Sequence, residues 1–145
     1  MDQPVTASLH ELVYAMDGYA ERVLVRRFGV DRSLFAFLVP LAAGPLDVTR
    51  LAESLNLTKA AVSKRVRPLE REGWLTTSSD PHHGRRVVLT LTPRGRSLVA
   101  AAGGLLESRF SALLASGPID PDTFHRQLRG LVEAVRALDP DQDLP

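Results

Sequence analysis

One face of a predicted helix carries side chains that can hydrogen-bond to nucleic acid. The helix is expected to begin near Thr58. Its outer face presents Ala60, Ser63, Lys64, Arg67 and Arg71. In the major groove of a duplex, small side chains let the backbone approach, hydroxyl and ammonium groups bond to bases, and guanidinium groups bind guanine or phosphate. This composition predicts a nucleic-acid-binding helix, although an ordinary solvated surface helix has a similar pattern, and the flanking segments distinguish the two.

A second helix is predicted immediately before this one. Asp47 can accept a hydrogen bond from the first turn, and Asn56 tolerates the left-handed conformation that ends a helix. Each helix also has a buried stripe at helical spacing. The two stripes are Val48, Leu51, Ala52 and Leu55, then Val62, Val66 and Leu69. Two helices joined by so short a turn, the second with an exposed basic face, indicate a helix-turn-helix.

Two predicted strands follow Gly73. They comprise residues 74–78 and 86–91, and the polar turn between them contains proline and glycine. Strand-forming residues on both sides of such a turn indicate a β-hairpin. With Arg85 and Arg86 near its tip, this hairpin makes the helix-turn-helix a winged helix. The expected fold class is therefore mainly α with a small β-hairpin wing.

The run from about Leu46 to Gly95 resembles the MarR family of bacterial transcriptional regulators. The matching segments are LAESLNLTKAAVSKRVRPLEREGWL, DPHHGRRVVLTLT and TPRG. The resemblance implies a homodimer that binds a pseudo-palindromic operator in double-stranded DNA, most often as a repressor, and that a small ligand often releases or modulates. By motif position, it places the groove contacts at Thr58, Lys59, Ala60, Ser63, Lys64 and Arg67. It places the minor-groove contact of the wing at Arg85, together with Arg86.

Two features depart from the family pattern. The wing of the family usually carries an acidic residue just before its arginines, where this chain has His83 and Gly84. A carboxylate that braces the wing is then expected from Asp80, or is absent. In addition, Pro68 lies inside the helix that begins near Thr58. It removes a backbone hydrogen-bond donor there, at a cost of about 3 kcal/mol or more. Either a kink with a locally broken ladder at residues 64–67 or a harmless bend at the far end of the helix is expected.

Composition disfavours several other functions. The chain has 145 residues with 18 basic and 17 acidic side chains, a net charge of +1, and no cysteine. Its four histidines lack the clustering of a metal site, so neither a metal nor a cofactor is expected. No nucleophile elbow, phosphate loop or HExxH motif indicates an enzyme. Neither a signal layout nor an apolar run of about 20 residues is apparent, so a cytoplasmic protein without membrane contact is expected.

A winged-helix module that binds protein and has lost DNA binding is the main alternative. The basic face of residues 59–71 and the arginine pair at the wing tip disfavour this alternative, since an interaction face tends to be apolar. Salt dependence separates the two functions, because contacts to several phosphates weaken steeply with salt.

Further helices are predicted on both sides of the winged helix. Ser8 and Glu11 have the spacing of a capping box, so the first helix is expected to start there after a loose segment 1–7. The first and last helices carry more apolar surface than a winged domain can cover, so a two-fold dimer is expected to pair them. The expected domains are an N-terminal dimerisation helix at 1–30, a winged helix-turn-helix DNA-binding domain at 31–92, and C-terminal dimerisation helices at 93–145.

Five aromatic rings could line a cleft for a small aromatic or lipophilic effector. They are Tyr14, Tyr19, Phe28, Phe35 and Phe37. An effector between the dimerisation helices and the winged domain would favour one spacing of the two recognition helices over another. Plain core packing is the commoner explanation for any single one of these rings.

Overall fold

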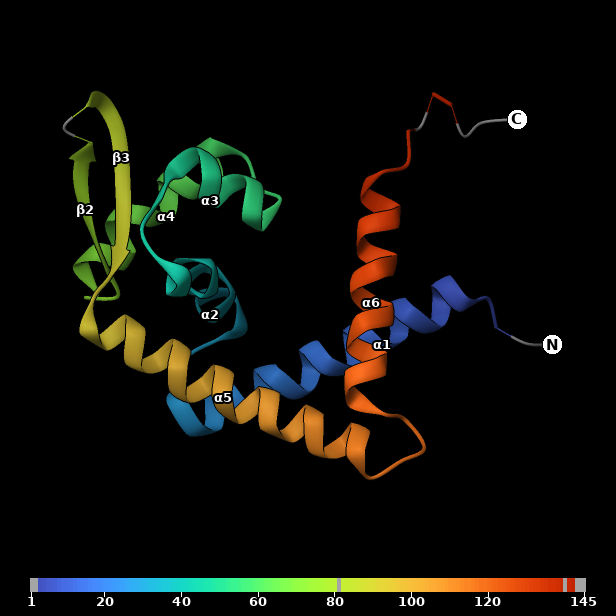
Figure 1. Ribbon diagram of the computed structural model, residues 1–145. Coiled ribbons are helices and arrows are strands. Elements are labelled where there is room, and N and C mark those ends of the chain that lie inside the picture. The colour runs from blue at the N-terminus through green and yellow to red at the C-terminus, as the bar shows by residue number, and fades with distance from the viewer. Residues whose placement is uncertain (1–2, 81, 140, 143–145) are drawn as a thin grey trace. The chain divides into compact units, whose positions relative to one another are not determined.

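The computed structural model describes residues 3–80, 82–139 and 141–142. The chain forms two compact units, Met1–Gly104 and Leu105–Pro145, and the boundary between them falls within one long helix. Within the described residues the elements are, in order, α1 (Val5–Val23), α2 (Arg32–Leu38), β1 (Leu46–Asp47), α3 (Val48–Leu55), α4 (Lys59–Arg71), β2 (Leu75–Asp80), β3 (His83–Leu91), α5 (Pro93–Ala115) and α6 (Pro121–Arg136). A mainly helical fold with a small antiparallel wing was predicted, and this fold class is confirmed (Figure 1).

Side-chain caps set the start of each helix of the winged region. Asp31, Asp47 and Thr58 each accept a hydrogen bond from the backbone N–H three residues ahead, at 2.7, 2.8 and 3.1 Å. Each residue lies in extended backbone just before α2, α3 and α4, respectively. Asn56 ends α3 in the left-handed conformation with φ 52°. The turn of the predicted helix-turn-helix is therefore built from local hydrogen bonds.

The start of α1 was predicted wrongly. The helix begins at Val5 after Pro4, so the Ser8–Glu11 pair lies inside it, and the Ser8 N–H donates to Pro4 O at 3.1 Å. Pro4 cannot extend the helix backwards but can precede its first turn, and Val5 to Ala7 are compatible with helical geometry. At its other end α1 passes into a π-helical turn, Leu24–Phe28, which Gly29 stops with φ 67°.

The sheet has three antiparallel strands in the order β1-β3-β2. The hairpin β2–β3 is longer than predicted, because its strands reach Asp80 and begin again at His83. Strand β1 was not predicted; its two residues, Leu46 and Asp47, pair with Leu89 and Val88 of β3. Figure 1 shows the hairpin beside α3 and α4. The third strand therefore joins the start of α3 to the wing.

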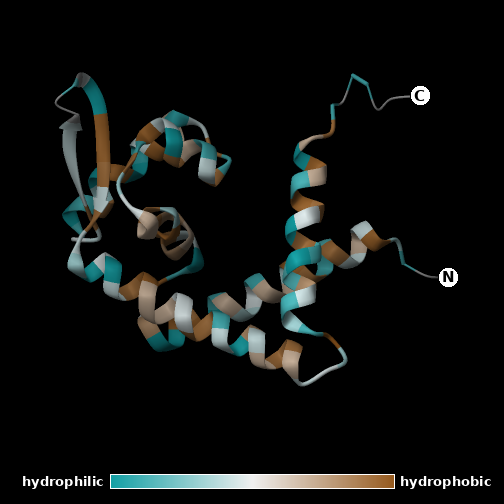
Figure 2. Cartoon of the chain, viewed as in Figure 1, coloured by the Kyte–Doolittle hydropathy of each residue, from teal (hydrophilic) through white to brown (hydrophobic). Residues whose placement is uncertain are grey.

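The core of the first unit gathers side chains from every element of the winged helix. The fully buried ones are Leu24, Phe37, Leu38, Leu51, Val62, Leu75 and Leu89. The predicted buried stripe of α4 is confirmed, since Val62, Val66 and Leu69 are all buried. Figure 2 shows the hydrophobic residues of these elements beside hydrophilic ones on the same helices. Burial of one stripe fixes which face of α4 remains open to solvent.

The base of the hairpin is joined closely to the start of α5. Thr92 caps this helix by accepting a hydrogen bond from Gly95 N at 3.1 Å, and its hydroxyl donates to Gly73 O at 2.6 Å. The Thr92 N–H also donates to Trp74 O at 3.1 Å. A Cβ atom on Gly95 would lie 2.2 Å from Trp74 O, so the helix and the strand approach through a residue without a side chain.

The expectation about apolar runs needs correction. By length and composition alone, α5 is long and apolar enough to cross a membrane. A helix after Thr92 was predicted, but the sequence analysis missed that its apolar and small residues together reach the length and composition of a membrane span. A core helix has the same composition, so this single helix is weak evidence for a membrane segment.

Candidate nucleic-acid interface

The outer face of α4 is exposed as predicted. The exposed residues on this face are Lys59, Ala60, Ser63, Lys64 and Arg67, and the cap Thr58 beside them is exposed too. Small side chains occupy the first turn, and the cationic ones follow. A backbone can approach base edges closely over such a first turn. The structure therefore brings all six predicted groove contacts to one accessible face.

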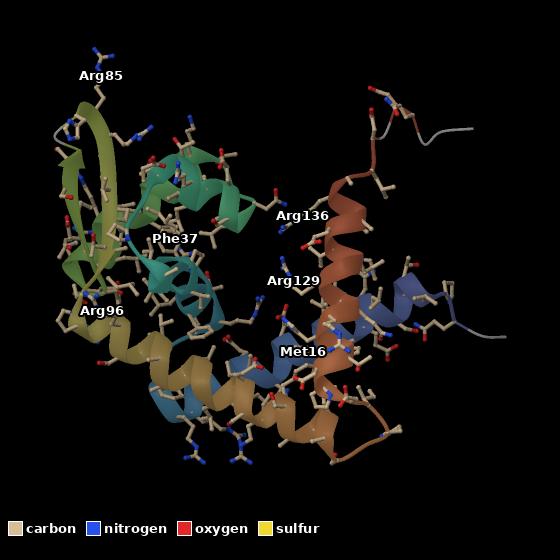
Figure 3. The ribbon with its side chains drawn as sticks, in the orientation of Figure 1. Met16, Phe37, Arg85, Arg96, Arg129 and Arg136 are labelled. Atoms are coloured by element: carbon tan, nitrogen blue, oxygen red, sulfur yellow. The ribbon has the colours of Figure 1, made fainter. Side chains whose placement is uncertain are left out.

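Arg65 is the basic residue of α4 that does not belong to this face. Its guanidinium lies over the ring of Phe37, 4.7 Å from the centroid, and its side chain is partly buried. Phe37 is only 1% exposed and lies within the first unit (Figure 3). A cation held over an aromatic ring contributes to packing, so this arginine anchors α4 to α2.

A carboxylate also ties α4 to the wing. Glu70 Oε2 accepts hydrogen bonds from both the backbone N–H and the hydroxyl of Thr77, at 2.8 and 2.7 Å. Thr77 lies on β2. The charged acceptor makes both bonds stronger than neutral ones. Glu70 therefore fixes the far end of α4 to the first strand of the hairpin.

Pro68 does not divide α4. The helix runs without interruption from Lys59 to Arg71 with this proline inside it. The six predicted groove contacts, Thr58 to Arg67, all precede the proline. Pro68 has no N–H to donate, so one bond of the helical ladder is lost there, but the helix continues for almost one further turn.

The wing carries its two arginines in different environments. Figure 3 shows Arg85 at the tip of the hairpin, pointing away from the protein, and its side chain is exposed. Arg86 instead directs its Nε atom to Asp47 Oδ2 at 3.2 Å. The predicted partner of the wing arginines was Asp80 or none, whereas the ion pair observed in the structure is made with Asp47. The side chain of Asp80 lies outside the described residues.

Sequence reasoning missed the residues that hold the base of the wing. Arg94 lies over the ring of Trp74, 3.8 Å from the centroid, and donates a hydrogen bond to Glu72 O. The Trp74 ring N–H donates to the Glu72 carboxylate at 3.2 Å. These contacts join the end of α4 to the start of α5. The sequence signal for them is slight, since it consists of one tryptophan and one arginine about twenty residues apart.

The five aromatic residues suggested for an effector lie in unlike surroundings. Phe37 is buried, Tyr14 is 74% exposed, and Tyr19 is 41% exposed. Phe28 and Phe35 are half-buried. Phe35 lies near α5, where a Cβ on Gly103 would meet its ring at 3.8 Å. Phe37 is occupied by core packing and Arg65, while the other four residues are half-buried or exposed.

The described residues contain no cluster of three or more histidine, cysteine or acidic side chains that could hold a metal ion.

Sequence comparison links the winged region to known regulators. A model of the MarR family matches residues 28–86. The uncharacterized HTH-type transcriptional regulator YxaD of Bacillus subtilis is 32% identical over 84 residues, a match that covers 57% of this chain and 59% of that protein. This chain therefore matches about three fifths of the length of the curated relative.

Solved structures share the fold over nearly the whole chain. The S. aureus MepR–DNA complex matches this chain with a TM-score of 0.74 at 21% identity. The match covers 95% of this chain and 100% of the MepR chain. NadR in complex with 4-hydroxyphenylacetate has a TM-score of 0.77 at 19% identity and covers 95% and 96%. At such identities, the similarity establishes a common fold.

Proposed function

We propose that the chain is a winged helix-turn-helix transcriptional regulator of the MarR family, whose model matches residues 28–86, and that it binds operator DNA in a sequence-specific manner as a homodimer. One observation carries this proposal: the small, polar and cationic face of α4 is exposed while the opposite stripe of the same helix is buried. An exposed face of this composition matches the hydrogen-bonding pattern of the major groove.

In the proposed complex, α4 enters the major groove with its first two turns. Ala60 allows close approach, while Ser63 and Lys64 bond to base edges and Arg67 binds guanine or phosphate. Thr58 and Lys59 lie at the positive end of the helix, where the backbone favours phosphate. Arg85 at the wing tip reaches the minor groove. MepR was solved as a DNA complex with the same fold, which supports this arrangement.

Exposed apolar side chains support the homodimer. On α1 they are Val5, Leu9, Leu12, Val13, Met16 and Tyr19, and on α6 they are Leu131, Val132, Val135 and Leu138. Figure 2 shows hydrophobic residues recurring along both helices. Apolar patches of this extent mark interaction surfaces. A two-fold dimer that covers them would present two α4 helices to half-sites about 34 Å apart.

Repression and its relief by a small ligand form the finer part of the proposal. A dimer on an operator blocks transcription when the operator overlaps a promoter. NadR was solved with 4-hydroxyphenylacetate, so an aromatic carboxylate is a reasonable first class of effector for this chain. Tyr19, Phe28 and Phe35 each keep ring surface accessible. A ligand acts only if it binds one spacing of the two recognition helices more tightly than the other.

Selection of bound sequences from random DNA tests the proposed function. The purified full chain should enrich a pseudo-palindrome whose half-sites are centred about one helical turn apart. Sedimentation of the complex should give two chains per duplex. The matched variants are Lys64→Ala, which should lose enrichment, and Arg136→Ala, which removes one positive charge from α6 and should retain it. No enriched sequence, or a strictly monomeric protein on DNA, would refute the proposal.

A further inference from the structure

The ion pair between Asp47 of β1 and Arg86 of β3 assigns a specific role to these two residues. We propose that these two residues form a brace that positions the wing for DNA, so that Arg86 acts through Arg85 and does not itself contact the duplex. The inference rests on the proposed function, and it replaces the expectation that both wing arginines are DNA contacts.

Asp47 joins three elements through one residue. Its Oδ1 atom accepts the first-turn hydrogen bond of α3 from Arg50 N at 2.8 Å, and its Oδ2 atom faces Arg86 Nε at 3.2 Å. Its backbone belongs to β1, where it pairs with Val88 of β3. The side chain is only 9% exposed. A carboxylate so buried requires partners on both oxygens, and here one partner is a helix start while the other is the wing.

The register of the sheet explains why Arg86 can reach Asp47. Val88 is the direct partner of Asp47, and Arg86 precedes it by two residues along β3. Residues two apart on a strand point to the same face, and a long side chain reaches the diagonal neighbour on the next strand. Arg85 lies in the stretch of β3 between His83 and Val87, where the register with β2 shifts, so strand alternation alone does not fix its direction. Figure 3 shows it extending from the hairpin tip.

The two adjacent arginines therefore have different roles. The Nε atom of Arg86 lies near the root of the guanidinium, so pairing through it holds the side chain back against the sheet. Only about half of that side chain is exposed. The brace joins β1, at the start of α3, to the half of β3 that is nearer the hairpin tip. It therefore sets the angle at which the hairpin carries Arg85 toward DNA.

Two substitutions separate the brace from the helix cap. Asp47→Ser keeps a hydroxyl that can cap α3 but cannot pair with Arg86, and Arg86→Ala removes the other partner. Each should weaken operator binding by about two- to fivefold, the range of a half-exposed ion pair. The double variant should bind no more weakly than the weaker single one, because both changes break the same contact. Asp31→Ser, which alters the equivalent cap of α2 and lies outside the Asp47–Arg86 pair, should bind like the wild type.

The salt dependence of binding distinguishes a positioning residue from a DNA contact. If Arg86 makes no phosphate contact, Arg86→Ala leaves the slope of log affinity against log salt unchanged. A direct phosphate contact would lower that slope by about 0.9. Amide hydrogen exchange of the wing in the free protein should be faster in Asp47→Ser and in Arg86→Ala alike. If Asp47→Ser fails to fold, Asp47→Asn keeps the size and the cap and replaces it.

The results that would contradict the brace differ from those that would contradict the proposed function. A lowered salt slope for Arg86→Ala, or losses from the two substitutions that multiply in the double variant, would overturn the brace while leaving DNA binding intact. Failure of the wild type to bind any duplex would instead remove the proposed function itself.

Discussion

Replacing Gly95 by alanine is expected to destabilise the protein, although the same change usually stabilises a helix. Gly95 lies in the first turn of α5, where an added Cβ would be 2.2 Å from Trp74 O and 3.2 Å from Leu91 Cδ2. Real Cβ atoms essentially never approach closer than 3.0 Å. The nearest atom is the backbone carbonyl oxygen of Trp74, which cannot rotate away as a side chain can. The start of α5 and the base of the hairpin must therefore separate by about 0.8 Å, the difference between 2.2 Å and 3.0 Å.

Two opposing contributions decide the effect of Gly95→Ala on stability: the gain in helix propensity and the cost of the steric clash. Alanine in place of glycine contributes up to about 1 kcal/mol of helix propensity. Overpacking of a close contact costs about 1–3 kcal/mol, and a rigid carbonyl places this site at the upper end. The separation would also lengthen the hydrogen bonds from Thr92 to Trp74 O and Gly73 O. We therefore expect a net loss of about 2 kcal/mol, or roughly 4–8 °C in Tm for a chain of this size.

Thermal and urea unfolding followed by far-ultraviolet circular dichroism measure this difference. Gly104→Ala is the matched control in the same helix, because nothing lies within 4 Å of the Cβ that it adds. The control should be neutral or stabilised by up to about 1 kcal/mol. Equal Tm values for wild type and Gly95→Ala, or a higher value for the variant, would refute the steric reasoning.

Three further predictions concern other parts of the chain. Lys64→Ala or Arg67→Ala should each weaken operator binding by about 1–3 kcal/mol if the side chain reads a base, and fluorescence anisotropy titrations that match the wild type would remove the assignment. Glu70→Ala should lower the free energy of unfolding in urea by about 1–3 kcal/mol, because two hydrogen-bond donors of β2 lose their acceptor; an unchanged midpoint would contradict this. The pKa of Asp120 lies below its ordinary value of 3.8 because side-chain and backbone hydrogen bonds from Thr123 stabilise the carboxylate. The α6 cap should therefore be fully present above pH 3.8 and be lost as the pH falls through the lower folded value; a titration of the Thr123 amide resonance with a midpoint at or above 3.8 would count against it.

Local signals made much of the winged helix predictable from sequence. Asp47, Thr58 and Asn56 act through backbone groups within three to five residues of themselves, so their side-chain types reveal the caps and the turn directly. The buried stripe and the exposed face of α4 follow from helical periodicity alone. For this reason the placement of Ser63 and Lys64 on an accessible surface could be expected before the fold was known.

Features made by distant residues were not predictable in the same way. Strand β1 has two residues and exists only because β3, some forty positions later, pairs with it. The Asp47–Arg86 pair depends on that register, so a search for a brace near the wing arginines pointed to Asp80 instead. The prediction that α1 starts at Ser8 was wrong for a different reason. The Ser8–Glu11 pattern is present in the sequence, but Val5 to Ala7 also suit a helix, so α1 begins earlier. The contact of Gly95 with Trp74 likewise arises only when two segments meet.

Chemical probing from inside the recognition helix tests the central claim most directly. The chain contains no cysteine, so Ser63→Cys creates a unique site for a DNA-cleaving iron chelate on the exposed face of α4, and Gln127→Cys places the same reagent on α6. We expect strand cleavage by the Ser63→Cys conjugate at two positions in the selected operator, about one helical turn apart, and none by the Gln127→Cys conjugate. Absence of cleavage from Ser63→Cys on bound operator, or an equal pattern from both sites, would contradict the claim that this face of α4 lies in the duplex.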